Sequence, residues 1–391
     1  MTLLPIVEAQ TRLFSLARPV MAETLPLAQA AGRWASADIV ARRTQPSADL
    51  SAMDGYAIRH ADMPGPWRVI GESAAGRPFA GDVGSGEATR IFTGAAMPPG
   101  TDTVLVQEEA AREGERLLLA GEGPAFRGRN TRRRGLDFSA GDRLIAAGER
   151  IIPARLALAA TAGHGVLPVR RRVRVALAAN GDELVEPGTS LDALPESNRA
   201  MLAALLADLP VEITDLGILP DRLDIMRDAF AAAQVDLLVT SGGASVGDHD
   251  LVRPALLAAG GKLDFWRVAL RPGKPMLAGQ LGEATVLGLP GNPVSAFVTT
   301  ILFVRPLIAH LAGAADPLPR TRPGVLGEDL PANNGRTDYL RAVERDGRVY
   351  AATVQDSSML LTLARATCLI VRPADAPAAQ AGDSAQILDI A

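Results

Sequence analysis

A glycine-rich segment, SGGASVGDHD at 241–250, has the residue types that suit a phosphate-binding loop. Glycines let backbone N–H groups come close to an anion, and serine hydroxyls add further donors. The candidate contacts in this loop are Ser241, Gly242, Gly243 and Ser245. For a single glycine-rich motif, the alternative is a tight structural loop with no ligand.

Carboxylates accompany this loop. Asp248 and Asp250 lie within it, and Asp182 and Glu183 occur in NGDEL, directly after a predicted strand. Two adjacent acids on a loop are usually a solvated cap. Four carboxylates at one sheet edge beside a phosphate loop would instead suit Mg²⁺ shared with substrate phosphates.

A cationic group comes from RPGKP and GRTDYLRA and comprises Arg271, Lys274, Arg336 and Arg341. The prolines around Gly273-Lys274 restrict the backbone and could fix the ammonium group in place. Rigidly placed Lys and Arg suit a tetrahedral dianion, and isolated surface cations are the alternative. Composition alone gives no function to two further segments. One is SAMDGYA at 51–57; the other is the arginine-rich RGRNTRRR, which is typical of a solvated stretch.

The elements that must position these groups alternate between strand and helix. Short apolar runs at 173–179, 211–219, 235–243 and 284–293 alternate with helical patterns at 198–208, 222–233 and 294–311. This alternation predicts a mostly parallel sheet with helices on both faces. Ligands bind such sheets beyond the carboxyl ends of the strands, which is where NGDELVEPG, SGGASVGDHD and GLPGNP lie.

The rest of the chain predicts a multidomain α/β and β protein. Apolar residues recur at helical spacing in the first forty residues, gly- and pro-rich short strands follow from about Thr44, and helix-like patterning returns around 141–165. The predicted domains are a discontinuous helical or mixed domain (1–43 plus 141–170), an inserted β domain (44–140), the α/β domain (171–316) and a small C-terminal β-barrel (317–391).

Composition narrows the function classes. The 391 residues are 48% hydrophobic, 21% charged and only 4% aromatic, so the cores must be built from Ala, Leu, Val and Ile. A net charge of -4 argues against a nucleic-acid partner. The single cysteine, Cys368, is expected to be buried, and four histidines make a His-rich zinc site improbable. We expect no membrane span, because Arg305 ends the apolar run 298–304, and no basic leader precedes Glu8, which indicates the cytoplasm.

Eight motifs in order along the chain resemble the molybdopterin molybdenumtransferase family, which includes bacterial MoeA and the C-terminal domain of gephyrin. They are SAMDGYA (51–57), FTGAAMP (92–98), RNTRRRGLD (129–137), GDELVEPG (181–188), SGGASVGDHD (241–250), RPGKP (271–275), GLPGNPVS (288–295) and GRTDYLR (335–341). The resemblance implies four domains and a homodimer with each active site at the cleft between protomers. Asp54, Thr93 and Asp137 would then line the wall opposite the partner's α/β domain.

The resemblance also implies roles for the other motifs. Asp182, Glu183, Asp248 and Asp250 would surround Mg²⁺ and the nucleotide phosphates, with Glu183 and Asp250 as metal ligands. Arg271, Lys274, Arg341 and Ser358 would hold molybdate, Pro290, Gly291, Asn292 and Pro293 would shape the floor, and Asp221 matches a further polar position. The family more often has Lys at position 271, and Thr or Ser at position 180, where this chain has Asn.

The implied reaction joins molybdate to adenylated molybdopterin and releases AMP and molybdenum cofactor. We expect Asp248 or Asp250 to serve the cleavage step and Lys274 and Arg341 to serve molybdate. Two alternatives remain, a molybdopterin adenylyltransferase and a non-catalytic pterin-binding scaffold. Further implied partners are a molybdopterin adenylyltransferase and apo-molybdoenzymes.

Overall fold

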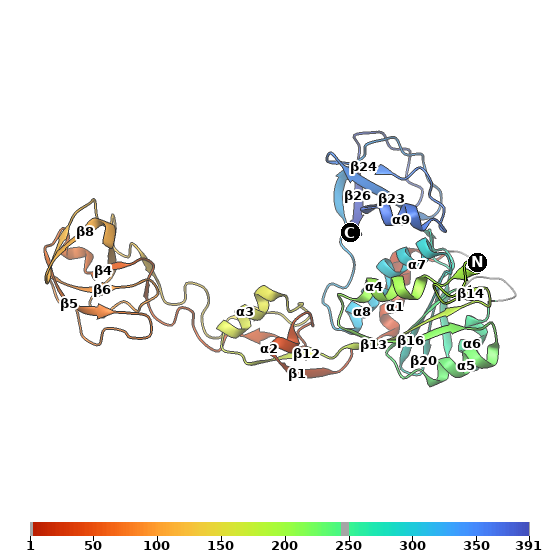
Figure 1. Ribbon diagram of the computed structural model, residues 1–391, viewed down its shortest axis with the longest axis horizontal. Helices are drawn as coiled ribbons and strands as arrows, with labels where there is room; N and C mark the ends of the chain where they lie inside the picture. Colours follow the sequence, from red (N-terminus) through yellow and green to blue (C-terminus); the bar gives the residue numbers. More distant parts are fainter. Residues whose placement is uncertain (1–2, 244–249, 391) are drawn as a thin grey trace. The chain divides into compact units, whose positions relative to one another are not determined.

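The computed structural model describes residues 3–243 and 250–390. The chain forms two compact units (Figure 1). The larger comprises Met1–Ala37, Ala147–Ile152 and Pro168–Ala391, and the smaller comprises Asp38–Ala146 and Pro153–Leu167. The finer division into four domains stays a prediction.

The larger unit is built on a six-stranded sheet of order β16-β13-β17-β21-β20-β18. Strands β16, β13, β17 and β21 run parallel, as predicted, whereas β20 and β18 continue the sheet antiparallel and were not predicted. The bounds are β13 Val173–Asn180, β16 Val211–Leu219, β17 Leu237–Ser241, β18 Lys262–Trp266, β20 Leu277–Leu281 and β21 Ala284–Leu289.

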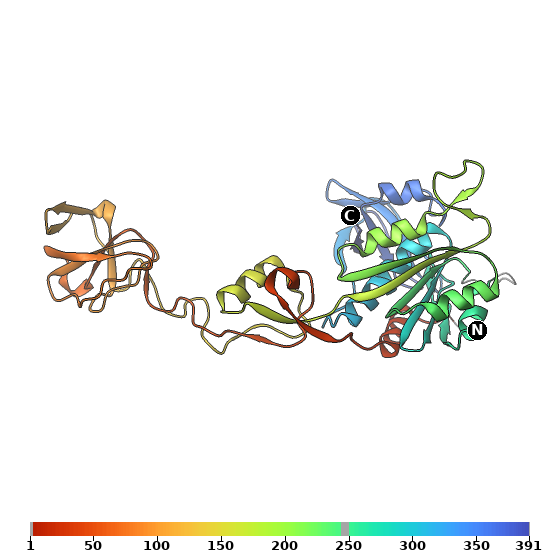
Figure 2. The same cartoon turned by 60° about the horizontal axis from the view of Figure 1, so that its bottom comes forward.

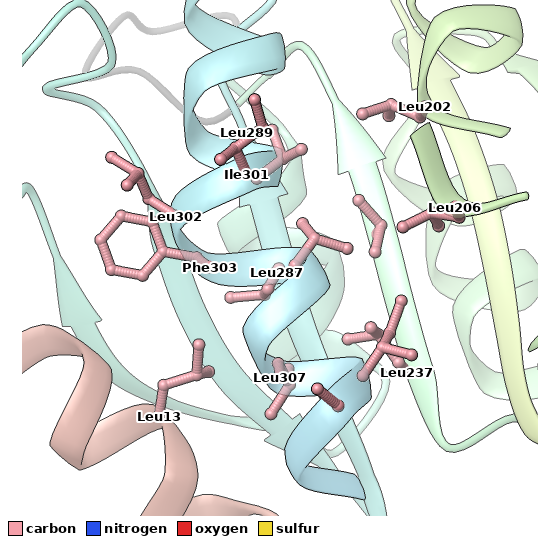
Figure 3. Close-up of a cluster of buried hydrophobic side chains, with 14 of the residues drawn as sticks. Leu13, Leu202, Leu206, Leu237, Leu287, Leu289, Ile301, Leu302, Phe303 and Leu307 are labelled. Carbon is pink, nitrogen blue, oxygen red and sulfur yellow. The ribbon is translucent and has the colours of Figure 1, made fainter. Parts of the chain in front are cut away.

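Helices cover both faces of this sheet (Figure 2). Because side chains alternate across a strand, Leu237 and Val239 of β17 enter one core cluster and Leu238 enters the other. The first cluster packs leucines and valines from the sheet against α1, α4 and the helix after β21 (Figure 3). The helices are α1 Ile6–Leu16, α4 Asn198–Leu206, α5 Leu223–Ala232, α6 Val252–Ala258, α7 Pro293–Thr299 and α8 Arg305–Leu311.

The helical path after β21 is continuous, because a π-helical segment at Thr300–Val304 joins α7 to α8. At 19 residues with a mean hydropathy of 1.7, Pro293–Leu311 is long and apolar enough to cross a membrane, so the prediction that no segment reaches this length was wrong. However, 89% of its apolar window is buried inside the fold. The segment serves as the central core helix of the larger unit.

A buried glutamine compensates for a proline in this helix. Pro306 has no N–H group and cannot donate to the Leu302 carbonyl one turn earlier. The Gln10 side chain of α1 donates to that carbonyl instead, with Nε2 2.8 Å from the oxygen. Gln10 is only 8% exposed, so this hydrogen bond fixes α1 against the core helix.

We therefore expect Gln10→Met to lower the free energy of unfolding by about 1–3 kcal/mol, because it leaves a buried carbonyl unpaired. Denaturant unfolding measures this loss. In a Pro306→Ala background the restored amide can reach Leu302, so the same Gln10 substitution should cost less there. An equal loss in both backgrounds would contradict this account.

The C-terminal part of the larger unit is a second sheet of order β19-β23-β25-β26-β22, with β24 paired to β23. Its strands agree with the β structure predicted for residues 317–391. Cys368 lies in β25 and is 1% exposed, which confirms the expected buried setting; burial raises the pKa of its thiol. The bounds are β19 Leu270–Arg271, β22 Arg322–Val325, β23 Thr337–Arg345, β24 Arg348–Ala351, α9 Leu360–Arg365, β25 Cys368–Arg372 and β26 Ser384–Asp389.

The short strand β19 joins the two sheets of the larger unit. It follows β18 in the chain but pairs in parallel with β23, which aligns Leu270 with Thr337 and Arg271 with Asp338. The RPGKP and GRTDYLR motifs are therefore neighbours in space.

The expectation of helix throughout the first forty residues was wrong beyond α1. Strands and a single short helix follow it: β1 Ala22–Pro26, α2 Leu27–Ala30 and β2 Ile39–Val40. The apolar spacing at 6–16 was a reliable sign of helix, but the later residues lack such spacing and take their structure from pairing with distant segments.

The smaller unit contains a six-stranded sheet of order β7-β4-β6-β5-β9-β8, in agreement with the predicted β segment. All five arginines of RGRNTRRR lie in this unit and are exposed. The remaining elements are β3 Leu50–Ser51, β4 Gly55–Ile58, β5 Trp67–Ser73, β6 Glu87–Ile91, β7 Thr103–Val106, β8 Ala110–Glu113, β9 Arg116–Leu119, β10 Thr131–Arg132, β11 Arg143–Ile145 and α3 Pro153–Thr161; β12 is Val166–Arg170.

Candidate active site

Three glycine-rich loops meet at one edge of the parallel sheet. The register pairs Ala179 of β13 with Ser241 of β17, and Ser241 with Leu289 of β21. The strands therefore end side by side, as predicted, and their loops border a pocket of about 640 Å³. It is lined by Asn180, Glu183, Leu184, Leu194, Pro195, Glu196, Ser197, Asn198, Ser241, Gly242, Gly243, Pro275, Pro290, Gly291, Asn292, Pro293, Ser358 and Leu360.

Close backbone approach explains the glycines of this pocket. Gly242 has a φ of +90°, and a Cβ there would lie 2.6 Å from the Asn180 carbonyl oxygen. The Asn180 Nδ2 in turn donates to the Gly242 carbonyl at 3.0 Å, which ties the loop to the end of β13. Among the predicted site residues, the pocket brings together Glu183, Ser241, Gly242, Gly243, Pro290, Gly291, Asn292, Pro293 and Ser358.

The predicted acids occupy two places at this edge. Glu183 lines the pocket, with its carboxylate folded back over Gly181. Asp182 and Asp221 bond to each other's backbone: the Asp221 amide donates to Asp182 at 3.0 Å, and the Asp182 amide donates to Asp221 at 3.4 Å. Asp250 is half-buried just before α6.

Two predicted residues of the phosphate loop, Ser245 and Asp248, lie outside the described residues. Within residues 3–243 and 250–390, no group of three or more His, Cys, Asp or Glu side chains is placed to hold a metal ion. A cation beside Glu183 would therefore draw other ligands from a bound substrate, as Mg²⁺ commonly does with phosphates.

The predicted cations do not line the described wall of the pocket, which includes no Lys or Arg. Lys274 is exposed and directly precedes Pro275, which does line it. Arg271 is half exposed and pairs with the buried Asp338. Arg336 is half-buried at the start of β23, next to the strand that carries Arg271.

Arg341 lies inside the C-terminal sheet, at 1% exposure. Its guanidinium donates to the Asp356 carbonyl at 2.8 Å and, more weakly, to those of Val354 and Met359 at 3.4 Å. Its Nε donates to the Gln355 side-chain oxygen at 3.2 Å. Arg341 therefore organises the loop from 352 to 359.

This loop carries Ser358 into the pocket. The Ser358 amide and hydroxyl both donate to the Asp356 carboxylate, at 2.9 and 2.6 Å, and these bonds lower the pKa of Asp356. Ser357 accepts from Asn292 Nδ2 at 3.0 Å, and its carbonyl accepts from the Val294 amide at 3.1 Å. The C-terminal sheet is thereby bonded to the GNP motif at the pocket floor.

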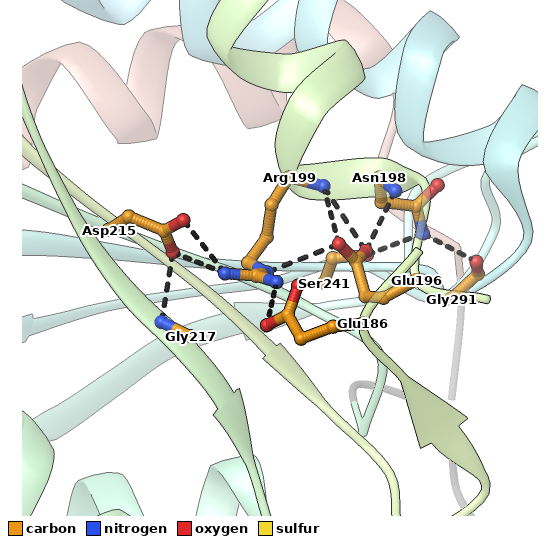
Figure 4. A network of polar contacts seen from close by, with 8 residues as sticks. All are labelled: Glu186, Glu196, Asn198, Arg199, Asp215, Gly217, Ser241 and Gly291. Atoms are coloured by element: carbon orange, nitrogen blue, oxygen red, sulfur yellow. Dashed lines mark hydrogen bonds and ion pairs between the residues drawn. The ribbon is translucent and has the colours of Figure 1, made fainter. Parts of the chain in front are cut away.

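Sequence reasoning missed a polar network at the start of α4 (Figure 4). Glu196, 3% exposed, accepts from the amides of Asn198 and Arg199 and caps the helix. The Arg199 guanidinium pairs with Glu196, Asp215 and Glu186. The acid in PESN, directly before a predicted helix, was a capping signal that could have indicated part of this network.

In the smaller unit, Asp54 and Thr93 lie together. The Asp54 carboxylate accepts from the Thr93 amide and hydroxyl, both at 2.7 Å, and these bonds lower the pKa of Asp54. Asp137 is exposed after β10, and its amide donates to the Gln45 carbonyl at 3.0 Å.

Family models match three consecutive regions of the chain. Residues 4–163 match the MoeA N-terminal region (domain I and II), residues 176–310 match a probable molybdopterin binding domain, and residues 323–390 match the MoeA C-terminal region (domain IV).

Full-length relatives agree with these matches. A molybdopterin molybdenumtransferase of Haemophilus influenzae is 37% identical over 94% of each chain, and one of Bacillus subtilis is 30% identical over 99% of this chain and 94% of its own. A crystal structure of a molybdopterin biosynthesis MoeA protein from Pyrococcus horikoshii OT3 matches all of both chains, with a TM-score of 0.86 and 26% identity. The chain belongs to the MoeA family of molybdopterin molybdenumtransferases.

Proposed function

We propose that this chain catalyses the transfer of molybdate to adenylated molybdopterin, with release of AMP and formation of molybdenum cofactor. The observation that carries the proposal is the pocket where the loops after β13, β17 and β21 meet the Ser358 loop of the C-terminal sheet. Glycine-rich backbone and the Ser241 hydroxyl suit a phosphate group. Lys274, which directly precedes the lining residue Pro275, and Arg271 of the same motif suit molybdate.

Mg²⁺ is proposed as the cofactor. The described lining contains Glu183 and Glu196 but no Lys or Arg, and Glu196 is paired with Arg199. A phosphate placed there would therefore meet the uncompensated negative charge of Glu183. When bound, Mg²⁺ would neutralise the phosphate oxygens, held by Glu183 and, in the same role, by Asp250. Asp182 and Asp221 hold the backbone that carries Glu183.

The substrates set the tasks of the other residues. Holding molybdate beside the pterin sulfurs removes the entropic cost of their encounter, and we assign this to Lys274, Arg271 and Ser358. Prolines on both sides restrict the backbone that carries Lys274. Arg341 acts on the site through the loop that carries Ser358.

We also propose a cytoplasmic homodimer in which the partner's smaller unit supplies Asp54, Thr93 and Asp137 to each site. Support comes from the exposed Asp54–Thr93 pair, whose carboxylate is held in one orientation by two short hydrogen bonds. Apo-molybdoenzymes and a molybdopterin adenylyltransferase are the proposed transient partners, with no nucleic acid and no membrane.

The activity is tested by incubating the chain with adenylated molybdopterin, molybdate and Mg²⁺ and then adding an apo-molybdoenzyme. We expect reactivation that requires the adenylated pterin. Production of adenylated pterin from ATP and free molybdopterin would instead support the adenylyltransferase alternative. Tight pterin binding without reactivation would support the scaffold.

The arrangement across two chains is tested by subunit complementation. Asp54→Asn and Glu183→Gln should each reduce turnover at least a hundredfold, because each removes a charge from the site. Differently tagged chains carrying one substitution each, purified as the mixed dimer, should regain up to half of the wild-type rate. Asp228→Asn, on the exposed face of α5, is the charge-matched control. A mixed dimer as inactive as its parents would mean that each site uses both residues from one chain.

A further inference from the structure

Asn198 connects two of the three loops at the pocket. It lies at the start of α4 and is 7% exposed. Its side-chain Nδ2 donates to the Ser241 hydroxyl oxygen and to the Gly291 carbonyl, both at 2.7 Å (Figure 4). Ser241 ends β17 and Gly291 follows β21, so a single amide group bridges the ends of adjacent strands.

The direction of these hydrogen bonds follows from the donors available. A backbone carbonyl only accepts, so the Gly291 oxygen requires the NH₂ group of Asn198 to face it. The same NH₂ group must therefore donate to Ser241 as well. Ser241 is an acceptor in this contact, and its own hydroxyl hydrogen is left for another acceptor.

No such acceptor occurs among the described residues, although Ser241 is only 2% exposed and lines the pocket. The Asn198 Oδ1 is likewise buried without a partner in this part of the chain. Native proteins seldom leave buried polar groups unpaired except where function requires them. Among the described residues, the Ser241 hydroxyl hydrogen therefore remains available to donate to a ligand in the pocket.

The backbone beneath Asn198 is also fixed. The Asn198 amide donates to Glu196 at 2.7 Å, and Glu196 is held by Arg199 at 3.1 Å. Arg199 is in turn anchored on Asp215 at 2.7 Å. A side chain on so constrained a helix start can orient a neighbour without loss of its own freedom on binding.

We propose that Asn198 is a positioning residue that presents the Ser241 hydroxyl as a proton donor to a phosphate oxygen of the nucleotide part of the substrate. The proposal rests on the proposed function, which already places a phosphate group at Ser241, and adds to it the residue that orients this hydroxyl. Asn198 acts through Ser241, and Ser241 touches the phosphate.

The test is a double-substitution cycle on AMP affinity, measured by calorimetry in the presence of Mg²⁺. Ser241→Ala should weaken AMP binding about tenfold, since it removes one hydrogen bond to a charged group. Asn198→Ala should weaken it by a similar factor, and the double variant should be no worse than either single one. Asn198→Asp, which cannot donate to Gly291 or Ser241, should bind no better than Asn198→Ala.

Several controls separate positioning from structure. Asn334→Ala, an exposed asparagine in the C-terminal part, should bind AMP like the wild type. Asn198→Ser keeps a small donor near Gly291, so it provides a second variant in case Asn198→Ala does not fold. Thermal unfolding shows whether each variant is folded. In turnover, the Asn198 and Ser241 substitutions should raise KM for the adenylated pterin by the same factor.

Multiplicative losses in the double variant would overturn the proposal, as would unchanged AMP affinity in a folded Asn198→Ala or Asn198→Ser protein. Failure of wild-type AMP binding would also overturn it. The proposed function fails separately, if the wild-type chain does not reactivate the apo-molybdoenzyme. A chain that reactivates it but shows independent effects at the two positions would refute only the role of Asn198.

Discussion

Arg341→Met is expected to abolish cofactor formation and to lower the free energy of unfolding by about 3–5 kcal/mol, because several buried acceptors lose their donor at once. The guanidinium is almost fully buried and donates to Asp356, Gln355 and neighbouring carbonyls. Its removal leaves these acceptors buried and unpaired, so the loop from 352 to 359 loses its anchor. Ser358 would then leave its place in the pocket.

The measurements are denaturant unfolding and apo-enzyme reactivation. Arg345→Met is the matched control, because Arg345 lies on the same strand but is exposed and stacks on Tyr350. Arg341→Lys should restore neither the stability nor the activity, since an ammonium lacks the forked geometry that reaches several carbonyls at once. A stable Arg341→Met protein with only a raised KM for molybdate would show that Arg341 contacts the oxyanion directly, as the family resemblance implies.

Arg199→Met is expected to have the second-largest effect. It should lower the free energy of unfolding, again by about 3–5 kcal/mol. Its side chain is 9% exposed and pairs with Glu196, which is 3% exposed. The substitution strands the Glu196 carboxylate in the protein interior without a counter-charge. The start of α4 and the Asn198 bridge depend on this carboxylate, so activity should fall as well.

A compensating change distinguishes charge from packing in this cluster. Glu196→Gln in the Arg199→Met background removes the stranded charge and should recover part of the lost stability. Arg227→Met, on the exposed surface of α5, is the control and should be near neutral. Equal stability of the wild type and Arg199→Met would contradict the account.

Asp215 makes the stability difference between the wild type and Arg199→Met depend on pH. Burial raises the pKa of Asp215, but the Arg199 hydrogen bonds and the Gly217 amide outweigh it, so its pKa in the folded protein is lowered. A lowered pKa contributes stability that is present above the unfolded value of about 3.9 and is lost as pH falls through the folded value. The stability difference between the wild type and Arg199→Met should therefore narrow below about pH 4.

The parallel part of the fold could be predicted because its signals are local. After Arg174, the run VRVALAA is apolar at every position from Val175 to Ala179, as a strand buried on both faces must be, and it became β13. Since parallel neighbours end at one edge, placing Glu183, Ser241 and Gly291 together required only the strand assignments. The sequence patterns of β18 and β20 are shorter, and their antiparallel pairing depends on contacts that no local pattern encodes.

The polar contacts of the site could not be predicted in the same way. The burial of Arg341, the mutual bonding of Asp182 and Asp221 and the bridge from Asn198 to Gly291 all join segments distant in the chain. An arginine in a motif looks the same in sequence whether it faces an oxyanion or a backbone carbonyl. Only the packing of the loop around Arg341 distinguishes the two.

In the proposed reaction, the pocket at the sheet edge couples the release of AMP to the insertion of molybdate. The most direct measurement is the rate of AMP release from adenylated molybdopterin, with molybdate and Mg²⁺ each present or omitted, for the wild type and Glu183→Gln. We predict fast release by the wild type only when both are present, and slow release by Glu183→Gln under every condition. Release by the wild type that is independent of molybdate, or unaffected by the Glu183 substitution, would contradict the account.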